Sequence, residues 1–86
     1  MPYEVEFSKR AAKDYDSLDR QTRERIDRKL EYLRATPRGA DTKKLVGTKK
    51  ELYRARVGTY RIIYQINDQI LRVYILNIDP RDAVYR

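Results

Sequence analysis

The segment LYRARVGTYRIIY, residues 52–64, predicts a β-hairpin and decides the fold. Two runs that alternate apolar and polar residues flank Gly58-Thr59, a pair suited to a two-residue turn. Such a turn places Arg56 directly opposite Arg61. Because side chains alternate between the faces of a strand, one face becomes apolar and faces the core: Tyr53, Ala55, Val57, Tyr60, Ile62, Tyr64 and Ile66. The other face takes Arg54, Arg56, Arg61, Ile63 and Gln65.

The facing arginines, Arg56 and Arg61, argue against a purely structural role for this hairpin. Like charges directly opposed across an antiparallel pair are destabilising by some fraction of ~1 kcal/mol. Sites where local stability rules fail are more often functional than average, and clustered guanidinium groups bind polyanions. The alternative is that a water-facing sheet surface is simply filled with arginine and lysine.

Composition restricts the chemistry available to the chain. Its 86 residues suit one domain, residues 1–86, with a single two-layer core. Twenty Lys and Arg against 13 Asp and Glu give a net charge of +7, which favours phosphate backbones or an acidic protein partner. The absence of cysteine and histidine argues against a transition-metal site and fits a reducing cytoplasm. No cofactor is expected. No apolar stretch approaches a signal peptide or membrane helix, so a soluble protein is expected.

The segment before the hairpin predicts a strand and two helices. Residues 2–7 alternate as in a half-buried strand. Ser8 can cap a helix over residues 9–17 that carries Ala12, Tyr15 and Leu18 on one stripe, and Asp19 can cap a longer helix over residues 20–36. Pro37 ends this helix. A short strand is expected around Leu45 and Val46.

A last strand over residues 70–78 follows a turn at residues 67–69. If Leu71, Val73 and Ile75 join the core, Arg72 and Tyr74 fall on the arginine face. The predicted fold is therefore α+β: an N-terminal strand, a helical hairpin, then an antiparallel three-strand meander, with the helices packed on one face of the sheet.

The open face then gathers groups suited to RNA. Arginines bind phosphate in bidentate fashion and stabilise a phosphorane-like transition state, while tyrosine stacks on bases. The candidate residues on this face and its C-terminal border are Arg54, Arg56, Arg61, Arg72, Tyr74, Arg81 and Tyr85. Lysines form a rim beside them: Lys43, Lys44, Lys49 and Lys50. The basic surface of the longer helix is interleaved with acidic residues and predicts a solvated, salt-bridged face instead.

The hairpin, followed by a strand and then DPRDAVYR at residues 79–86, resembles the RelE/ParE toxin superfamily in its RelE branch. The shared pattern is a basic hairpin of the form [YR]-x-[KR]-x-G-x-[YR]-R-[IVL]-[IVL]-Y with a late arginine and a near-terminal tyrosine. It spans about the last third of the chain, and the N-terminal likeness is one of topology. The resemblance implies the toxin of a type II toxin–antitoxin system.

For RelE-type members the resemblance implies a metal-independent endoribonuclease that cuts mRNA in the ribosomal A site. The 2′-hydroxyl attacks the adjacent phosphate and leaves a 2′,3′-cyclic phosphate and a 5′-hydroxyl. By motif, Arg54 and Arg56 would flank the scissile group and Arg61 would stabilise the phosphorane. Arg81 would serve the leaving group, and Tyr85 would stack on or orient the nucleotide.

Two features depart from the familiar pattern. The best-known members carry lysine where this chain has Arg54 and Arg56, and an arginine with a pKa above ~12 does not readily act as a general base. Catalysis is then expected to be mainly electrostatic. The sequence does not identify the general base that deprotonates the 2′-hydroxyl. In addition, only Arg86 follows Tyr85 in this sequence, whereas family members often carry a longer tail after this tyrosine.

The resemblance also implies partners and leaves alternatives. An antitoxin, the ribosome with its mRNA, and operator DNA bound as the toxin–antitoxin complex are the expected partners; no membrane is expected. A ParE-like, non-nucleolytic inhibitor of DNA gyrase is the alternative on the same fold, and an RNA-binding module without chemistry is a third possibility. The combination of Arg61, Arg81 and Tyr85 favours the nuclease.

Overall fold

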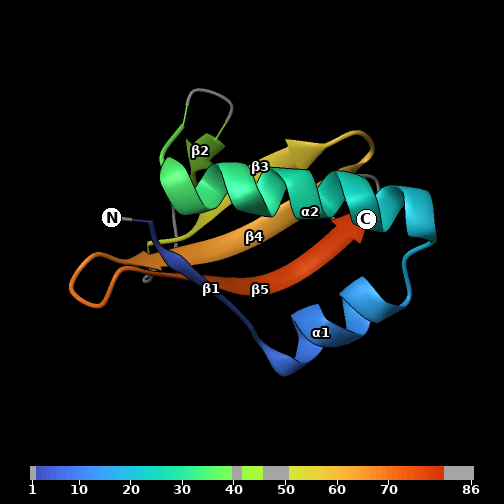
Figure 1. Cartoon of the computed structure of the whole chain (residues 1–86), viewed down its shortest axis with the longest axis horizontal. Helices are drawn as coiled ribbons and strands as arrows, with labels where there is room; N and C mark the ends of the chain where they lie inside the picture. Colours follow the sequence, from blue (N-terminus) through green and yellow to red (C-terminus); the bar gives the residue numbers. More distant parts are fainter. Residues whose placement is uncertain (1, 40–41, 46–50, 81–86) are drawn as a thin grey trace.

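The computed structural model describes residues 2–39, 42–45 and 51–80, and it has an α+β fold with two helices on one five-stranded sheet (Figure 1). The elements are β1 (Glu4–Phe7), α1 (Lys9–Asp16), α2 (Arg20–Ala35), β2 (Thr42–Lys44), β3 (Tyr53–Val57), β4 (Tyr60–Asn67) and β5 (Arg72–Pro80). The strand order is β1-β5-β4-β3-β2. All neighbours are antiparallel except β1 and β5, which run parallel. The predicted fold class is confirmed, and the predicted meander is the centre of a larger mixed sheet.

Both predicted helix caps are present. The side chain of Ser8 accepts a hydrogen bond from the backbone N–H of Ala11, and that of Asp19 accepts one from Thr22. Each cap satisfies an amide that the first helical turn leaves without a partner. The apolar stripe of α1 differs from prediction, because Ala11 is fully buried and Ala12 is exposed.

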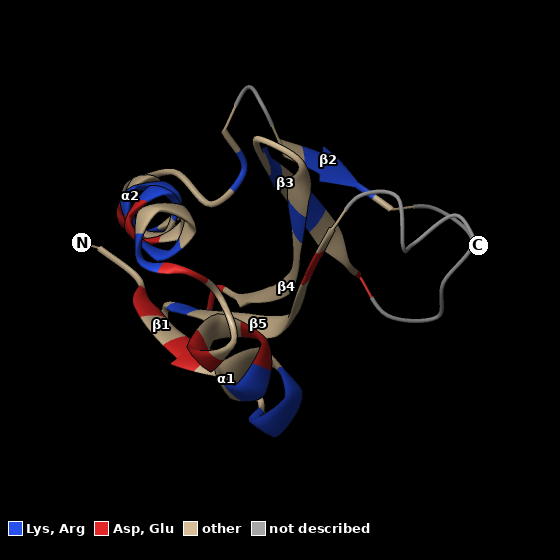
Figure 2. Cartoon of the chain, turned by 90° about the vertical axis from the view of Figure 1, so that its right-hand side faces the viewer, with Lys and Arg blue, Asp and Glu red and all other residues tan. Residues whose placement is uncertain are grey.

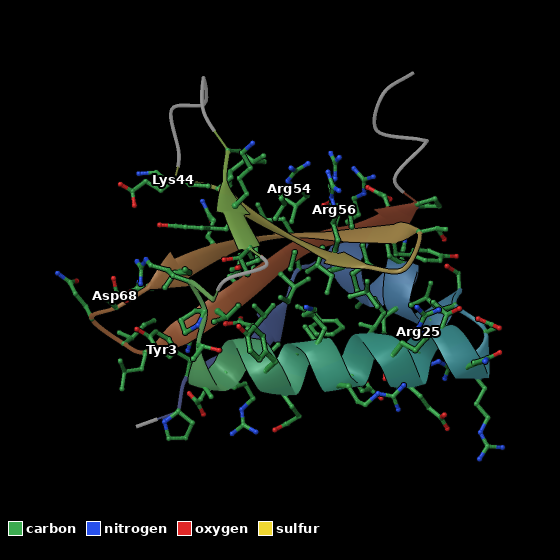
Figure 3. All side chains as sticks on the ribbon, turned by 90° about the horizontal axis from the view of Figure 1, so that it is seen from above. Tyr3, Arg25, Lys44, Arg54, Arg56 and Asp68 are labelled. Atoms are coloured by element: carbon green, nitrogen blue, oxygen red, sulfur yellow. The ribbon has the colours of Figure 1, made fainter. Side chains whose placement is uncertain are left out.

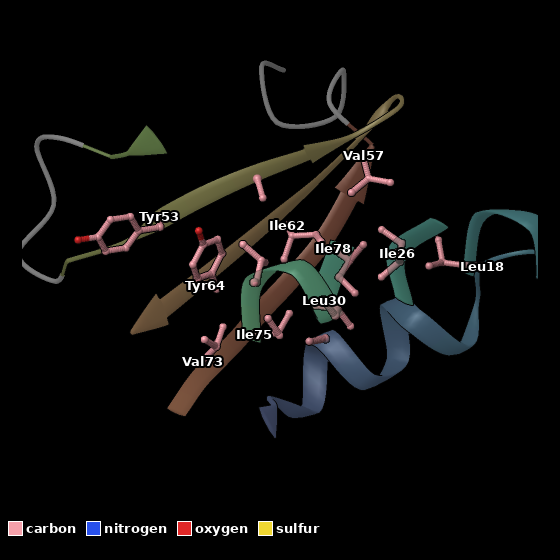
Figure 4. Close-up of a cluster of buried hydrophobic side chains, with 13 residues drawn as sticks. Leu18, Ile26, Leu30, Tyr53, Val57, Ile62, Tyr64, Val73, Ile75 and Ile78 are labelled. Atoms are coloured by element: carbon pink, nitrogen blue, oxygen red, sulfur yellow. The ribbon is translucent and has the colours of Figure 1, made fainter. Parts of the chain in front are cut away.

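The hairpin has the predicted register, with Arg56 opposite Arg61 and Val57 opposite Tyr60. Its apolar face packs with α1, α2 and β5 into one core (Figure 4). The buried members are Ala11, Leu18, Ile26, Leu30, Leu33, Tyr53, Ala55, Val57, Ile62, Tyr64, Val73, Ile75 and Ile78. The alternation of the hairpin sequence therefore fixes which face lies against the helices.

The last strand begins later than predicted. Leu71 has a φ of 53° and lies in the turn, so β5 starts at Arg72 and Leu71 is outside the buried core. The turn itself is held by Asn67, whose Oδ1 accepts hydrogen bonds from the backbone N–H groups of Gln69 and Ile70. Further along β5 the register shifts beside Ile63 and Tyr64. This bulge explains how Ile78 joins Val73 and Ile75 in the core, which strict alternation would not allow.

Both edges of the sheet differ from the prediction. The short strand expected around Leu45 and Val46 lies earlier, at Thr42–Lys44, and Val46 is outside the described residues. On the other side β1 ends at Phe7, and Ser8 and α1 then make hydrogen bonds to the border of β5 that β1 leaves unpaired. There Ser8 Oγ donates to the carbonyl of Leu76 at 2.8 Å, and Asp14 Oδ2 accepts from the backbone N–H of Ile78 at 2.9 Å.

The helices lie on one side of the sheet, as predicted, and α2 runs across it (Figures 1 and 3). In the part of the chain that the structure describes, no helix covers the opposite face. Charge divides along the sheet: lysine and arginine are concentrated on β2 and β3, whereas β1 carries acidic residues (Figure 2). Neither described helix combines the length and the hydrophobicity of a membrane-spanning segment.

Candidate nucleic-acid interface

The helix-free face is organised in three rows of side chains that cross the strands. One row holds Arg56, Arg61 and Asp79, which are paired in register on β3, β4 and β5. The middle row holds Lys43, Arg54, Ile63 and Asn77. The third row holds Gln65, Tyr74 and Glu6. Successive rows are two residues apart along β4, which corresponds to about 7 Å.

Arg61 is the most enclosed cation of this face. It is 4% exposed, whereas Arg56 opposite it is exposed and Arg54 is half-buried. Arg61 lies on the central strand β4, between β3 and β5. A side chain fixed in this way loses little further freedom when an anion binds, which is the condition for preorganised electrostatic stabilisation. The sequence predicted the position of Arg61 but not its burial.

The middle row extends the positive charge onto the sheet border. Lys43 of β2 is in register with Arg54 of β3. Figure 3 shows Arg54 and Arg56 on the side of the sheet away from α2. Lys44, predicted beside Lys43, is in register with Tyr53 instead, and its Nζ lies 3.4 Å from Oε1 of Glu51. Lys43 therefore adds to the arginine surface more directly than Lys44.

Asp79 is a member of the first row that the sequence analysis did not assign to the site. It is directly opposed to Arg61, and its Oδ2 accepts a hydrogen bond from Nη2 of Arg10 at 2.9 Å. Arg10 comes from α1, where that helix continues the border of the sheet beyond β1. The sequence offered one signal for Asp79, because this residue directly follows residue 78, where the last strand was expected to end. The bulge keeps Asp79 within β5.

The third row lies in a groove of about 800 Å³ beside the β4–β5 turn. We call it the turn groove; its lining includes Glu6, Gln65, Asn67, Ile70, Arg72 and Tyr74. The predicted RNA-binding residues Arg72 and Tyr74 are thus separated from Arg56 and Arg61. Nη1 of Arg72 lies 2.9 Å from Oε1 of Glu6, so this guanidinium is already paired with a carboxylate.

A polar cluster surrounds Asp68, which lines the turn groove. Tyr3 donates from its hydroxyl to Oδ1 of Asp68 at 2.7 Å, and the guanidinium of Arg38 donates to both oxygens of Asp68. The hydrogen bonds from Arg38 lower the pKa of Asp68, and the hydrogen bond to Asp68 raises the pKa of Tyr3. Nε of Arg38 also donates to the hydroxyl of Tyr53 at 3.2 Å.

The structure thus brings together part of the predicted site. Lys43, Arg54, Arg56 and Arg61 share two adjacent rows, and Arg72 and Tyr74 line the groove. The predicted site residues Lys49, Lys50, Arg81 and Tyr85 lie outside the described residues. In the described ranges there is no group of three or more histidine, cysteine, aspartate or glutamate side chains that could hold a metal ion.

Comparison with protein families gives one match over almost the whole chain. Residues 5–85 match the family described as ParE toxin of type II toxin-antitoxin system, parDE. Among curated relatives, the mRNA interferase toxin RelE of Escherichia coli is 29% identical over 84 residues, which is 95% of this chain and 86% of that protein. Toxin RelG of Mycobacterium tuberculosis is 34% identical over 93 residues, covering 100% of this chain and 99% of that toxin.

Solved structures show the same similarity. The RelE–RelB complex from Pyrococcus horikoshii contains a chain that is 35% identical, with a TM-score of 0.81, 94% of this chain and 97% of that chain being covered. The RelBE2 complex of Mycobacterium tuberculosis gives 30% identity and a TM-score of 0.80, with 94% and 100% covered. This chain belongs to the RelE/ParE superfamily of type II toxin–antitoxin toxins, in its RelE-type branch.

Proposed function

We propose that this toxin is a metal-independent endoribonuclease that cleaves mRNA in the A site of the ribosome. The observation that carries the proposal is the first row of the helix-free face. There a nearly buried Arg61 stands on the central strand beside the exposed Arg56, with Arg54 in the next row. Two curated relatives are named as mRNA interferases. The arrangement suits a phosphate placed over these arginines.

In the proposed reaction the 2′-oxygen bonds to phosphorus and its hydroxyl proton passes to water, while the bond from phosphorus to the 5′-oxygen breaks and that oxygen takes up a proton from water. Arg61 stabilises the negative charge that develops on the phosphorane oxygens. Arg54 and Arg56 hold the phosphate from β3, and Arg81 neutralises the leaving 5′-oxygen. Tyr85 stacks on the nucleotide and orients it for in-line attack.

The role of the arginines is electrostatic. The chain has neither histidine nor cysteine, and an arginine keeps its proton at neutral pH. Preorganised charge of this kind typically lowers a barrier by a few kcal/mol. Lys43, Lys44, Lys49, Lys50, Arg72 and Tyr74 are assigned to RNA binding.

We infer that a cognate antitoxin binds this chain, since several of the similar structures are complexes of RelE with RelB or with a RelB peptide. A chain of net charge +7 with a helix-free sheet face suits an acidic, extended partner that covers the arginines. The ribosome and its mRNA are the targets in the cytoplasm, and the toxin–antitoxin complex binds operator DNA. Co-expression of a co-encoded acidic protein should restore growth; toxicity that persists despite binding would contradict the antitoxin assignment.

The decisive experiment is a cleavage assay on programmed ribosomes, with Mg²⁺ kept at the concentration that holds the ribosome together and with a chelator selective for transition metals. We expect a cut within the A-site codon that leaves a 2′,3′-cyclic phosphate, and no cut in the same mRNA without ribosomes. Inhibition of DNA gyrase is the second candidate, because the matching family is described as ParE toxin. Loss of supercoiling activity in a gyrase assay, with mRNA left intact on ribosomes, would support it instead.

A further inference from the structure

The turn groove differs in chemistry from the arginine rows, although both lie on the helix-free face. Three carboxylates contribute to its lining: Glu6, Glu51 and Asp68. Each is matched by a cation, since Glu6 meets Arg72, Glu51 meets Lys44 and Asp68 meets Arg38. Because these cations are already engaged, a phosphate entering the groove would meet carboxylates without gaining a new counter-charge.

The middle of the groove instead suits a flat, neutral ligand. Tyr74 lies between Gln65 of β4 and Glu6 of β1, in register with both. Aromatic rings stack on nucleobases, and amide and carboxylate groups hydrogen-bond the edges of unpaired bases. The contact with Arg72 engages Oε1 of Glu6, and the Glu6 side chain is still 49% exposed. Its carboxylate can therefore also accept from a ligand.

The position of the groove connects it to the arginine rows. The row of Tyr74 follows the row of Arg54 along β4, at a spacing of about 7 Å. An RNA strand whose phosphate lies over Arg54 and Arg61 would therefore present a neighbouring base to Tyr74. A volume of about 800 Å³ is within the range of pockets that hold small planar ligands.

We propose that the turn groove binds one unpaired base of the mRNA beside the cleaved bond, and that it selects a base with an exocyclic amino group over uracil. Tyr74 stacks on the base, and the carboxylate of Glu6 accepts from the amino group, as carboxylates do with the 4-amino group of cytosine. The side-chain amide of Gln65 contacts the same edge of the base. The proposal rests on the nuclease function above and names the part of the substrate that this face reads.

The first test needs no cleavage. Cytidine and uridine differ in the 4-amino group and carry no phosphate, so they probe the groove apart from the arginines. Titration of the isotope-labelled toxin, followed by NMR, should shift the amide signals of Glu6, Gln65 and Tyr74 more with cytidine than with uridine. Absence of shifts at these residues, or equal shifts with both nucleosides, would overturn the proposal.

The second test measures selectivity on ribosomes, with mRNAs that carry cytosine or uracil at each position of the A-site codon and at the nucleotides flanking it. At one position the wild type should cleave the cytosine message about tenfold faster. Glu6→Gln should remove most of this difference. Glu4→Gln is the matched control, because it makes the same change of charge on the same strand at a residue outside the groove lining. An equal loss of selectivity in both variants would refute the role of Glu6.

Tyr74 separates stacking from hydrogen bonding. Tyr74→Ala should lower kcat/KM by about tenfold on either message, whereas Tyr74→Phe should stay close to the wild type. A Tyr74→Ala variant with unchanged kcat/KM would contradict the stacking role. If the wild type bound cytidine in the groove but cut no mRNA, the nuclease function would fail while the base site would stand. Cleavage without any base selectivity would refute the base site and leave the nuclease function standing.

Discussion

Asp68 accepts hydrogen bonds from both Nη atoms of Arg38, at 3.2 and 2.9 Å. The contact ties the β4–β5 turn to the loop after α2, and the hydroxyl of Tyr3 joins it from the N-terminal segment. Three segments distant in sequence are thus fixed at one carboxylate. This carboxylate lies in the wall of the turn groove, so its ionisation bears on both stability and the shape of that wall.

Asp68→Asn should lower the thermal midpoint at neutral pH, and the difference from the wild type should vanish in acid. The pKa of Asp68 is lowered in the folded protein, chiefly by the hydrogen bonds from Arg38. Its stabilising effect is therefore complete above the unfolded pKa of about 3.9 and is lost as the pH falls through the lowered folded value. Thermal midpoints of the variant and the wild type at about pH 6 and about pH 2 test this. Asp16→Asn, an exposed carboxylate on α1, controls for net charge.

Arg61→Ala should lower single-turnover cleavage on ribosomes by ~100-fold or more, while ribosome binding weakens far less. The expectation follows from a rigid, nearly buried cation at the developing charge, with many other cations left for binding. Arg81→Ala should behave in the same way. Cleavage rates at saturating toxin separate the two effects, and a rate loss fully recovered at high toxin concentration would show that Arg61 serves binding alone.

Arg56→Ala should change stability and activity in opposite directions. Removing one of the two opposed arginines relieves a repulsion worth a fraction of ~1 kcal/mol, so the thermal midpoint should rise. The cleavage rate should fall, since a phosphate contact is lost. A variant that was less stable and fully active would identify Arg56 as a structural residue.

Gly58→Ala should destabilise the fold by about 1 kcal/mol, measured by urea unfolding. Gly58 has a φ of +57°, in the left-handed region that a side chain disfavours. A Cβ atom there would also meet Nη2 of Arg25 at 2.7 Å, but this is the end of a flexible side chain that can move away. Gly58→Asn distinguishes the causes: asparagine tolerates this φ, so a smaller loss than with alanine identifies backbone strain, whereas a larger loss would identify crowding against Arg25.

Affinity for ribosomes or RNA should fall steeply with salt. Several lysines and arginines that meet phosphates release counterions on binding, and each contact adds to the slope of log affinity against log salt concentration. Filter binding from about 50 to about 200 mM salt measures that slope. An affinity independent of salt over this range would contradict phosphate binding by the basic face.

The hairpin was predictable in detail because its alternation and its Gly58-Thr59 turn are local signals. They gave the pairing of Arg56 with Arg61 and the core face. The helix caps at Ser8 and Asp19 were predictable for the same reason. The sequence also predicted the strand positions of Arg54, Arg56 and Arg61.

What the sequence did not reveal depends on tertiary contacts. The bulge in β5 changes which residues face the core, and no local pattern marks it; Ile78 and Asp79 owe their places to it. The burial of Arg61 depends on neighbouring strands and not on its own segment. The turn groove and the pairing of Arg72 with Glu6 required β1 to lie beside β5. Strict alternation also placed Leu71 in a strand, where the turn gives it a left-handed backbone instead.

The parallel pairing of β1 with β5 also sets an order of events during synthesis. Among the described residues, the first strand pairs with the last one, and the contact of Ser8 with Leu76 that closes this border spans 68 residues. Long-range pairing of this kind forms slowly, since the loop must close before the contact contributes. A nascent toxin therefore holds its N-terminal strand unpaired until β5 has emerged from the exit tunnel.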